Sequence, residues 1–306
     1  MIKRLLPFLT LITLFILLAL ASPYFLTTTN LSSVVRQTAV INIMALGMTV
    51  IIISGGIDLS VGSILAMAGL VGTMAMERGM PIPFGVLIGI VVGLFWGYVN
   101  GVLITRLRVE PFIVTLGTLG IVRGLTLIIS NGLPVHNIPR GFSFIGEGTL
   151  VGVPFVLWIL LVCALLVHLT LDRTRLGRYC YAIGSNREAA IYAGIPVQYH
   201  LTAIYAIGGA LTGLAGMIEA SRLMTGQPTA GQGYELQAIA AVVIGGGSLR
   251  GGEGSVVGTL IGAFIMGLLS NGSDLLGISP YLQQAIIGAV IILAVTVDEL
   301  RKRRGV

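Results

Sequence analysis

The stretch Arg173–Gln198, RTRLGRYCYAIGSNREAAIYAGIPVQ, is the longest polar interruption in a chain that is otherwise almost entirely apolar. The residues from Glu188 onward predict a short helix that Gly194 ends, with Pro196 just beyond it as an ordinary helix stop. We expect membrane spans on either side of residues 173–198, and a partner outside the membrane that binds this polar segment. Its charged residues include Arg173, Arg175, Arg178, Arg187 and Glu188.

The composition excludes a soluble globular domain. Of the 306 residues, 55% are hydrophobic and 10% are charged, whereas about a quarter of the residues in soluble domains are charged. A bilayer removes the need for a charged surface, so we predict an all-α polytopic membrane helix bundle that forms one transmembrane domain over residues 1–306. The 43 glycines agree with this class, because small residues let membrane helices pack closely.

The charged and reactive residues argue against nucleic acid binding, metal binding and catalysis. The net charge is +6, yet the basic residues gather in short loops, as in membrane proteins, and form no nucleic-acid patch. Cys163 and Cys180 have no CxxC neighbour and the histidines have no ligand spacing, so we expect no metal or other cofactor. The sequence has no GxSxG, HExxH or GxxxxGKS/T pattern. We therefore expect no enzyme activity, and ATP-driven transport would need another chain to hydrolyse ATP.

A membrane span needs about 20 apolar residues, and ten stretches are candidates. The first, Leu5–Leu26, contains Ala19-Leu20-Ala21, which resembles a signal-peptide cleavage site. Its apolar run is longer than the core of most signal peptides, so we favour a retained span and keep cleavage as the alternative. The other nine predicted spans are Val34–Ser54, Asp58–Met76, Pro83–Ile104, Phe112–Ser130, Val153–Leu171, Leu201–Ser221, Gln237–Gly246, Ser255–Leu269 and Tyr281–Val297.

Ten spans would place both termini on one side of the membrane, and the basic residues indicate which side it is. Thirteen Lys and Arg lie on the side of the termini, four at positions 36, 78, 140 and 222 lie on the other, and Arg123 falls within a span. Basic residues concentrate in cytoplasmic loops, so we predict cytoplasmic N- and C-termini. The thirteen are Lys3, Arg4, Arg106, Arg108, Arg173, Arg175, Arg178, Arg187, Arg250, Arg301, Lys302, Arg303 and Arg304.

Two glycine-rich stretches of the chain resemble each other. VIIISGG at residues 50–56 and VVIGGG at residues 242–247 each precede a polar break and then another apolar run. Both breaks would face the cytoplasm, so the pattern indicates a parallel internal repeat of the kind that transporters use, with the pathway at the repeat interface.

One predicted span carries a stripe of glycines. They recur at every fourth position and therefore lie on one helix face. Such a stripe favours close packing of another helix over a substrate groove, which stays the alternative. The stripe consists of Gly85, Gly89, Gly93, Gly97 and Gly101.

Ionisable and polar residues within the spans are the candidate pathway residues. Asp58 stands in a break at residues 55–63 and could cap the next helix, or could line a pathway or gate together with Ser60. For Arg123 we favour pairing with a buried acid or with carbonyl groups over contact with substrate. The polar residues that could line a pathway, or could instead join helices by hydrogen bonds, are Asn42, Thr115, Thr118 and Gln237.

Five motifs, taken together and in this order, carry a family resemblance that covers nearly the whole chain. They are GGIDLSVGS at 55–63, PFIVTLGTLGIVRG at 111–124, TRLGRYCYAIGSNREAAIYAGI at 174–195, QPTAGQGYELQAIAAVVIGGGSL at 227–249 and GGEGSVVGTLIGA at 251–263. The chain resembles the permease subunits of bacterial ATP-binding-cassette sugar importers, in the ribose-type branch.

The resemblance implies an inner-membrane importer of a monosaccharide, with ribose or a related pentose as the first expectation. It also implies three kinds of partner: two cytoplasmic ATPase subunits, a periplasmic sugar-binding protein and a second permease in the lipid bilayer. We expect a second copy of this chain, which makes a homodimer, and keep a heterodimer as the alternative. Residues 181–190 would then form the cytoplasmic coupling segment that docks into the ATPase. The expected coupling residues are Arg178, Tyr181, Gly184, Asn186, Arg187, Glu188, Ala189 and Gly194.

Two positions depart from the family pattern. Gly184-Ser185-Asn186 stands where many relatives have two glycines before the asparagine, which could stiffen this turn. Glu110 precedes Pro111, where a neutral residue is usual, and the sequence offers no explanation for it.

Three other functions remain alternatives. An ion-coupled secondary sugar transporter needs ionisable coupling sites within the spans, for which only Asp58, Arg123 and Glu219 are available. A membrane-embedded enzyme would need a cluster of acids or histidines, which the sequence lacks. The same importer could carry another substrate, such as a hexose, galactofuranose or a furanosyl signalling molecule. The motifs disfavour a branched-chain amino acid.

Overall fold

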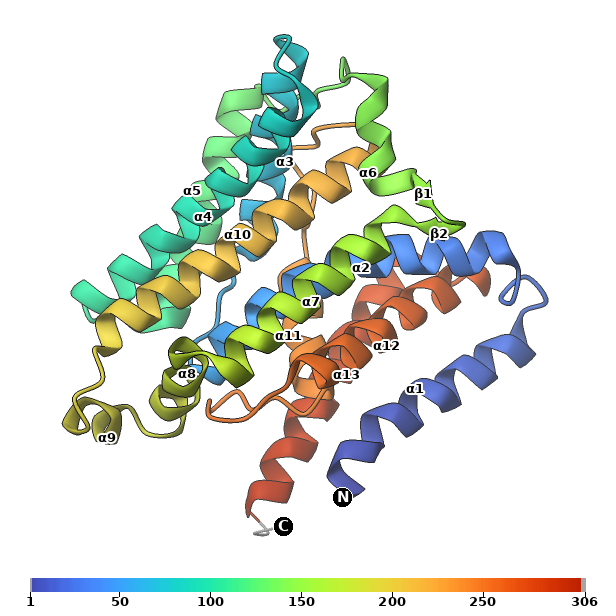
Figure 1. Ribbon diagram of the computed structural model, residues 1–306. Coiled ribbons are helices and arrows are strands. Elements are labelled where there is room, and N and C mark those ends of the chain that lie inside the picture. The colour runs from blue at the N-terminus through green and yellow to red at the C-terminus, as the bar shows by residue number, and fades with distance from the viewer. Residues whose placement is uncertain (1, 304–306) are drawn as a thin grey trace.

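The computed structural model describes residues 2–303, and this part of the chain is almost entirely helical (Figure 1). The only strands among these residues are two antiparallel strands of two residues each, in which Thr149 lies opposite Pro154 and Leu150 lies opposite Val153. The all-α class is therefore confirmed. The elements are α1 (Ile2–Ala21), α2 (Thr28–Ile53), α3 (Val61–Glu77), α4 (Ile82–Arg106), α5 (Pro111–Ser130), the 3-10 helix η1 (Arg140–Phe142), α6 (Ser143–Glu147), β1 (Thr149–Leu150), β2 (Val153–Pro154), α7 (Phe155–Arg173), α8 (Arg175–Ser185), α9 (Arg187–Tyr192), α10 (Val197–Leu223), α11 (Tyr234–Ile244), α12 (Val256–Leu275) and α13 (Pro280–Arg303).

Each of the ten predicted spans coincides with a helix. Six of the helices, α2, α4, α5, α7, α10 and α12, are long and apolar enough to cross a membrane by length and composition. The other four, α1, α3, α11 and α13, contribute apolar stretches of 10–17 residues. A polytopic helical membrane architecture is therefore confirmed, whereas the number of crossings stays a prediction.

The glycine stripe of α4 lies against α10, which favours the packing interpretation. A β-carbon on Gly97 would lie 3.0 Å from the α-carbon of Gly209, and one on Gly93 would lie 2.8 Å from the α-carbon of Gly213. These backbones approach too closely for any side chain. The centre of the molecule is α2, whose inner two-thirds are buried from Thr38 to Ile53.

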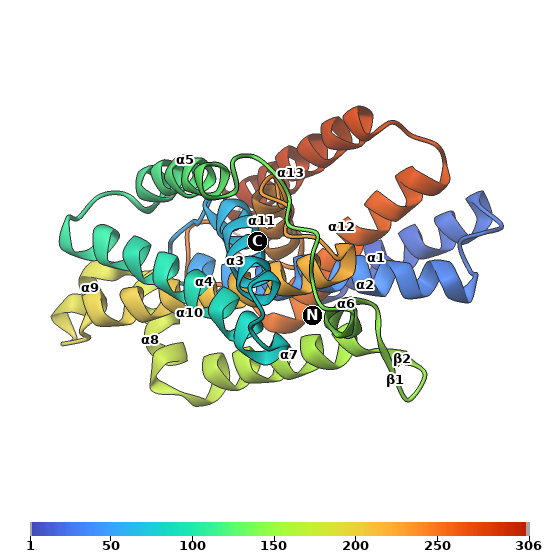
Figure 2. The same ribbon diagram turned by 90° about the horizontal axis from the view of Figure 1, so that it is seen from above.

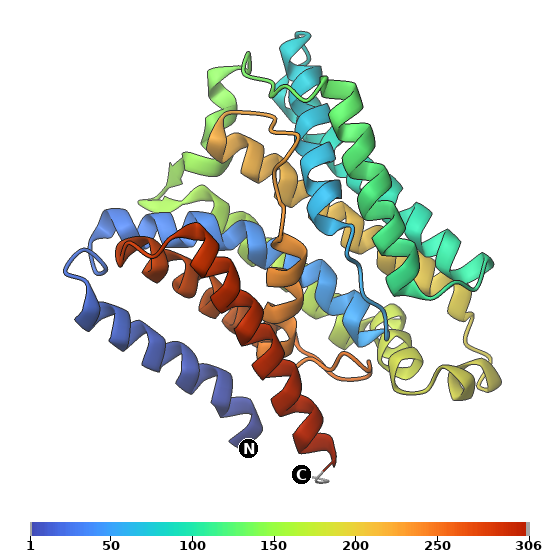
Figure 3. The same ribbon diagram turned by 180° about the vertical axis from the view of Figure 1, so that it is seen from behind.

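The molecule has two distinct ends. Helices α8 and α9 lie at the end where both termini lie, and we call this the inner end (Figures 1 and 3). The α3–α4 turn and α6 lie at the opposite, outer end. The two resembling stretches both finish at the inner end, where the Gly252 amide donates a hydrogen bond of 2.8 Å to the Ile53 carbonyl. Whether they form a repeat stays a prediction, and Arg304 of the basic C-terminus lies outside the described residues.

The polar segment 173–198 contains two helices where we expected one. The expected short helix is α9, which Asn186 caps by accepting a hydrogen bond of 2.9 Å from the Ala189 amide, and Gly194 follows it with a φ of +78°. The helix missing from the prediction is α8, where Gly177, Cys180 and Ile183 are buried. Their spacing of three residues was the available signal, but Arg173, Arg175 and Arg178 in and just before this helix are typical of a polar loop.

Candidate functional site

The first break in the helical bundle, Ser54–Ser60, connects α2 to α3. We expected this span to begin at Asp58, but the helix begins at Val61. Asp58 is fully buried, and its carboxylate accepts hydrogen bonds from the amide (2.9 Å) and the hydroxyl of Ser60. Asp58 therefore does not occupy the cap position of α3, and it instead fixes the turn that leads into the helix.

Neighbouring helices close this break from both sides. The Asn100 side-chain amide of α4 donates a hydrogen bond of 2.9 Å to the Ser60 hydroxyl. The Thr115 hydroxyl of α5 lies 3.2 Å from the Ile57 carbonyl and donates to it. The Tyr205 hydroxyl of α10 packs against Gly56, where a β-carbon would collide with it. The polar side chains of the first break, Asp58 and Ser60, are thus enclosed within the protomer.

The second break, Met224–Gly233, connects α10 to α11. It passes alongside α3, because Gly226 packs against Thr73 and Gly231 packs against Gly62. At 1.5 Å per residue, the length of α3 from Thr73 to Gly62 is about 16 Å, and α11 is about equally long. A bilayer core is about 30 Å thick, so α11 is too short to cross it alone.

Arg123, in the second half of α5, holds the two breaks together. Its guanidinium donates hydrogen bonds to the carbonyls of Pro228 (2.7 Å) and Ala230 (3.0 Å) in the second break. It also donates to the carbonyl of Gly62, 3.3 Å away, in the first turn of α3. The expected carbonyl-binding role of Arg123 is therefore what the structure shows.

Polar side chains of the second break are exposed, unlike those of the first. Thr229 and Gln232 are exposed, and Gln227 donates a hydrogen bond of 3.0 Å to the Thr229 hydroxyl. Glu235, in the first turn of α11, is partly buried and accepts a hydrogen bond of 3.2 Å from the Gly233 amide. The sequence analysis did not select these residues, although a proline and three glycines between two apolar stretches signal an irregular backbone.

The predicted pathway residues separate into two groups. Asp58, Ser60 and Thr115 meet at the first break, where all three are buried. The remaining three make no hydrogen bond to that cluster within the described chain: Asn42 is buried in α2 and bonds the Thr38 carbonyl, Thr118 is buried in α5, and Gln237 is partly exposed in α11.

At the inner end, α8 is fastened to the ends of both interrupted regions. The Cys180 thiol donates to the Val50 carbonyl at 3.2 Å, and the Tyr181 hydroxyl donates to the Gly254 carbonyl at 3.0 Å. Gly184 packs directly on Ile53, where a β-carbon would collide with the carbonyl. Burial raises the pKa of the Cys180 thiol to about 12, so this thiol stays protonated and unreactive.

A groove of about 780 Å³ opens beside α9 at the inner end. One wall is the α4–α5 connection, including Arg108 and Glu110, and the other includes Arg187, Ile191 and Tyr199. Glu110, the unexplained departure from the family pattern, thus lies in the same groove as Arg187. Of the expected coupling residues, Tyr181 and Gly184 pack against the bundle, and the exposed ones are Arg178, Asn186, Arg187, Glu188, Ala189 and Gly194.

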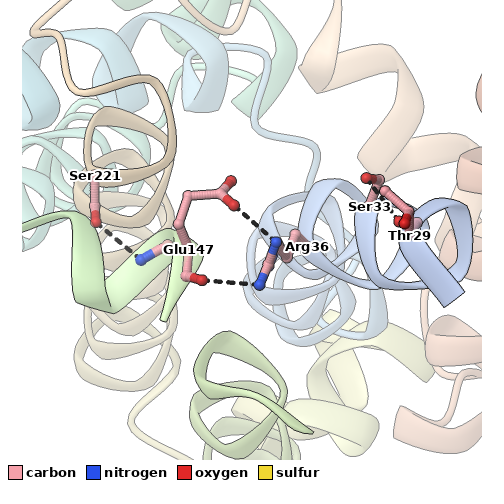
Figure 4. A network of polar contacts seen from close by, with 6 residues as sticks. Thr29, Ser33, Arg36, Glu147 and Ser221 are labelled. Carbon is pink, nitrogen blue, oxygen red and sulfur yellow. Dashed lines mark hydrogen bonds and ion pairs between the residues drawn. The ribbon is translucent and has the colours of Figure 1, made fainter. Parts of the chain in front are cut away.

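At the outer end, α6 is clamped between α2 and α10 (Figure 4). Arg36 donates two hydrogen bonds of 2.8 Å to Glu147, one to its carboxylate and one to its carbonyl. The Gly146 amide donates to the Ser221 hydroxyl at 2.9 Å. At each end of the molecule, polar contacts therefore tie a short helix to the longer ones: α8 at the inner end and α6 at the outer end.

Comparison with known proteins places the chain in a family. Residues 30–295 match the family described as branched-chain amino acid transport system / permease component. The ribose import permease protein RbsC of Escherichia coli (strain K12) is 44% identical over 300 residues, which cover 96% of this chain and 94% of the relative. RbsC of Bacillus subtilis (strain 168) is 42% identical over 298 residues, with 97% and 92% covered.

A more distant relative is the D-allose transport system permease protein AlsC of Escherichia coli (strain K12), 38% identical over 283 residues, with 92% and 87% covered. No solved structure matches the chain significantly. The family match spans most of the chain and includes both breaks and α8–α9. The chain belongs to the family of branched-chain amino acid transport system permease components.

Proposed function

We propose that this chain is the permease subunit of an ATP-binding-cassette importer that carries a monosaccharide, ribose or a related pentose, across the bacterial inner membrane. The similarity to ribose, allose and arabinose permeases supports the substrate class. Its partners are cytoplasmic ATPase subunits, a periplasmic sugar-binding protein and a second permease copy, in a lipid bilayer. The inner end, with both termini, faces the cytoplasm, which agrees with the distribution of basic residues.

Helices α8 and α9 give the main support for this proposal, because they combine exposed charged residues with a buried face that contacts the bundle. Their exposed residues, Arg178, Arg187 and Glu188, are available to a partner. The buried face of α8 is fastened to the end of α2 and to the loop after α11 by Cys180, Tyr181 and Gly184. A displacement of α8 and α9 is therefore transmitted directly to the end of α2 and to the loop after α11. A coupling segment has to transmit movement in this way.

The mechanism follows as a shift between two conformations. ATP binding closes the two ATPases and moves α8–α9, which changes access to a pathway between the two permease copies from inward to outward. Sugar then enters from the binding protein and is released inside. ATP shifts the population because it has different contacts with the partners in the two states.

Ion coupling finds less support, because Asp58 and Glu219, the two acids that the sequence offered for it, already have partners. Glu219 forms an ion pair of 2.9 Å with Arg222 and accepts a hydrogen bond of 3.2 Å from Tyr234. Asp58 is engaged by Ser60. A coupling site would need an acid that can exchange its ion with an open pathway.

Uptake of labelled ribose tests the proposal. Cells that lack this protein receive it with either the active partner ATPase or a variant that cannot hydrolyse ATP. We expect uptake only with the active ATPase. Uptake with both would indicate a secondary carrier or channel. If neither strain takes up labelled ribose, ribose is excluded as the substrate. A panel of other labelled sugars is then tested in its place.

A further inference from the structure

The second break lies at the depth of the membrane spans. Its residues Pro228 and Ala230 bind Arg123, which stands in the second half of the candidate span α5, and Gly231 packs on the first turn of α3. Figure 3 shows this segment descending beside α3 to the start of α11. Arg123 satisfies two of its carbonyls, so the segment is held in place as an ordered part of the bundle.

Lipid cannot cover this segment. A non-helical backbone at membrane depth occurs only where protein or water surrounds it, and exposed amide and hydroxyl side chains avoid hydrocarbon for the same reason. Thr229 and Gln232 are nevertheless exposed in the protomer. Figure 2 shows α5 and α13 on one side of the molecule with α3 and α11 between them. This side of the protomer therefore faces water or the second permease copy of the proposed dimer, and not lipid.

Hence we propose that Thr229 and Gln232 of the second break, with Glu235 beside them, line the sugar pathway and form hydrogen bonds with the hydroxyl groups of the passing monosaccharide. This inference rests on the proposed function and replaces most of the residues that the sequence suggested, because Asn42, Asp58, Ser60, Thr115 and Thr118 are buried within the protomer. The first break then serves as structural support, and the second break contacts the substrate.

The chemistry of these three side chains suits a neutral polyol. A hydroxyl and an amide each both donate and accept hydrogen bonds, and a carboxylate accepts two or more. The groups come from one short segment with a fixed backbone, so they contact only one side of a sugar. Such a partial site binds weakly, and weak binding permits release into the cell.

Cysteine labelling tests the placement without relying on transport. Thr229→Cys and Gln232→Cys variants of the full chain, assembled with the partner ATPase in membrane vesicles, are treated with a charged, membrane-impermeant methanethiosulfonate reagent. Leu165→Cys is the matched control, because Leu165 is 56% exposed on the apolar surface of α7. The wild-type chain gives the background, because Cys163 and Cys180 are both buried.

We expect the two pathway cysteines to react at least tenfold faster than the control, and saturating ribose to slow the reaction at least threefold. Rates equal to that of Leu165→Cys, with and without ATP, would overturn the proposal, as would the absence of protection by ribose, arabinose and allose alike. If the wild-type chain fails to import ribose but fast labelling is slowed by another of these sugars, the proposed substrate fails and the pathway assignment stands.

A second measurement separates contact with sugar from an effect on folding. Gln232→Ala is expected to change the ratio of ribose to arabinose uptake at least threefold, and Gln232→Asn to restore part of it. An unchanged ratio in both variants, at equal amounts of protein in the membrane, would contradict a role in contacting the sugar.

Discussion

The two breaks of this bundle look similar in sequence but differ in how the rest of the protein covers them. Both are rich in glycine, and each precedes a helix too short or only just long enough to cross a bilayer alone. In the first, Asp58 and Ser60 face each other and Asn100, and all three are buried. In the second, Thr229 and Gln232 are exposed.

The difference lies in what surrounds each segment. Three helices, α4, α5 and α10, supply side chains that cover the first break. The second break is held by Arg123, by α3 and by two backbone hydrogen bonds between Gly226 and Val135. Its side chains Thr229 and Gln232 nevertheless stay exposed. A polar break in a membrane protein therefore indicates a pathway only when its polar side chains stay exposed and are not covered by neighbouring helices.

Replacing Arg123 should have the largest effect, because this residue joins the two breaks. Arg123→Ala removes three hydrogen bonds from a charged donor and leaves the carbonyls of Pro228 and Ala230 without it. We expect a loss of about 3 kcal/mol in stability and at least a tenfold loss of uptake. Thermal unfolding in detergent measures the first effect. Arg140→Ala, at an exposed position of the outer end, is the control, and equal melting temperatures for the two variants would contradict the bridging role.

The second-largest effect is expected from disrupting the hydrogen bonds of Asp58 in the first break. Asp58→Ala removes the acceptor of the Ser60 amide and hydroxyl, so buried donors lose their partner and stability should fall by about 2 kcal/mol. Asp58→Asn keeps an acceptor and should lose less. Exposed Asp274 provides the control through Asp274→Ala. The same thermal unfolding assay applies, and a larger loss for Asp58→Asn than for Asp58→Ala would show that charge, and not hydrogen bonding, matters here.

The inner ends of both interrupted regions meet at Gly184, which offers a test of their connection. A β-carbon there would lie 2.6 Å from the Gly252 amide nitrogen and would also collide with the Ile53 carbonyl, so Gly184→Ala should cost about 1–3 kcal/mol by overpacking. We expect uptake per ATP hydrolysed to fall at least threefold, as measured in reconstituted vesicles. Ser185→Ala is the control, and an unchanged ratio for Gly184→Ala would argue against transmission through this contact.

The smallest effect on stability should come from the second break. Thr229→Ala and Gln232→Ala change exposed side chains, so each should alter stability by no more than about 0.5 kcal/mol. Their melting temperatures should match that of the wild type within error, while ribose uptake falls. A large loss of stability would mean that these side chains have partners in the assembled protein and that the contrast between the two breaks is weaker than proposed.

The sequence predicted the helical spans well because their signal is local. Each of the ten apolar stretches became a helix, and the period of four in the α4 glycines correctly indicated close packing. The identity of the partner, α10, was not predictable, because glycine carries no information about what packs against it.

The proposed pathway residues were harder to predict from the sequence, because the burial of a side chain depends on distant parts of the chain. Asp58 was a candidate because it is an acid within the predicted spans. In the structure, Asn100 of α4 and Thr115 of α5 form hydrogen bonds with its neighbours in the first break and help to bury it. Thr229 and Gln232 were ordinary polar residues in the sequence, and they stand out only because no neighbouring element covers them. In α8, the buried residues Gly177, Cys180 and Ile183 are three residues apart, which is a helical spacing. The arginines of this stretch favoured the interpretation as a loop.

The length of α11 has a consequence for biosynthesis. A stretch of about 20 apolar residues can leave the translocon for the bilayer by itself, but Tyr234–Ile244 is only 11 residues long and the polar second break precedes it. We therefore expect its insertion to depend on neighbouring helices, among them α12, against which it packs: the Gly262 backbone contacts the Ala241 carbonyl closely. Helices α10 to α12 are thus expected to enter the membrane as one cooperative unit.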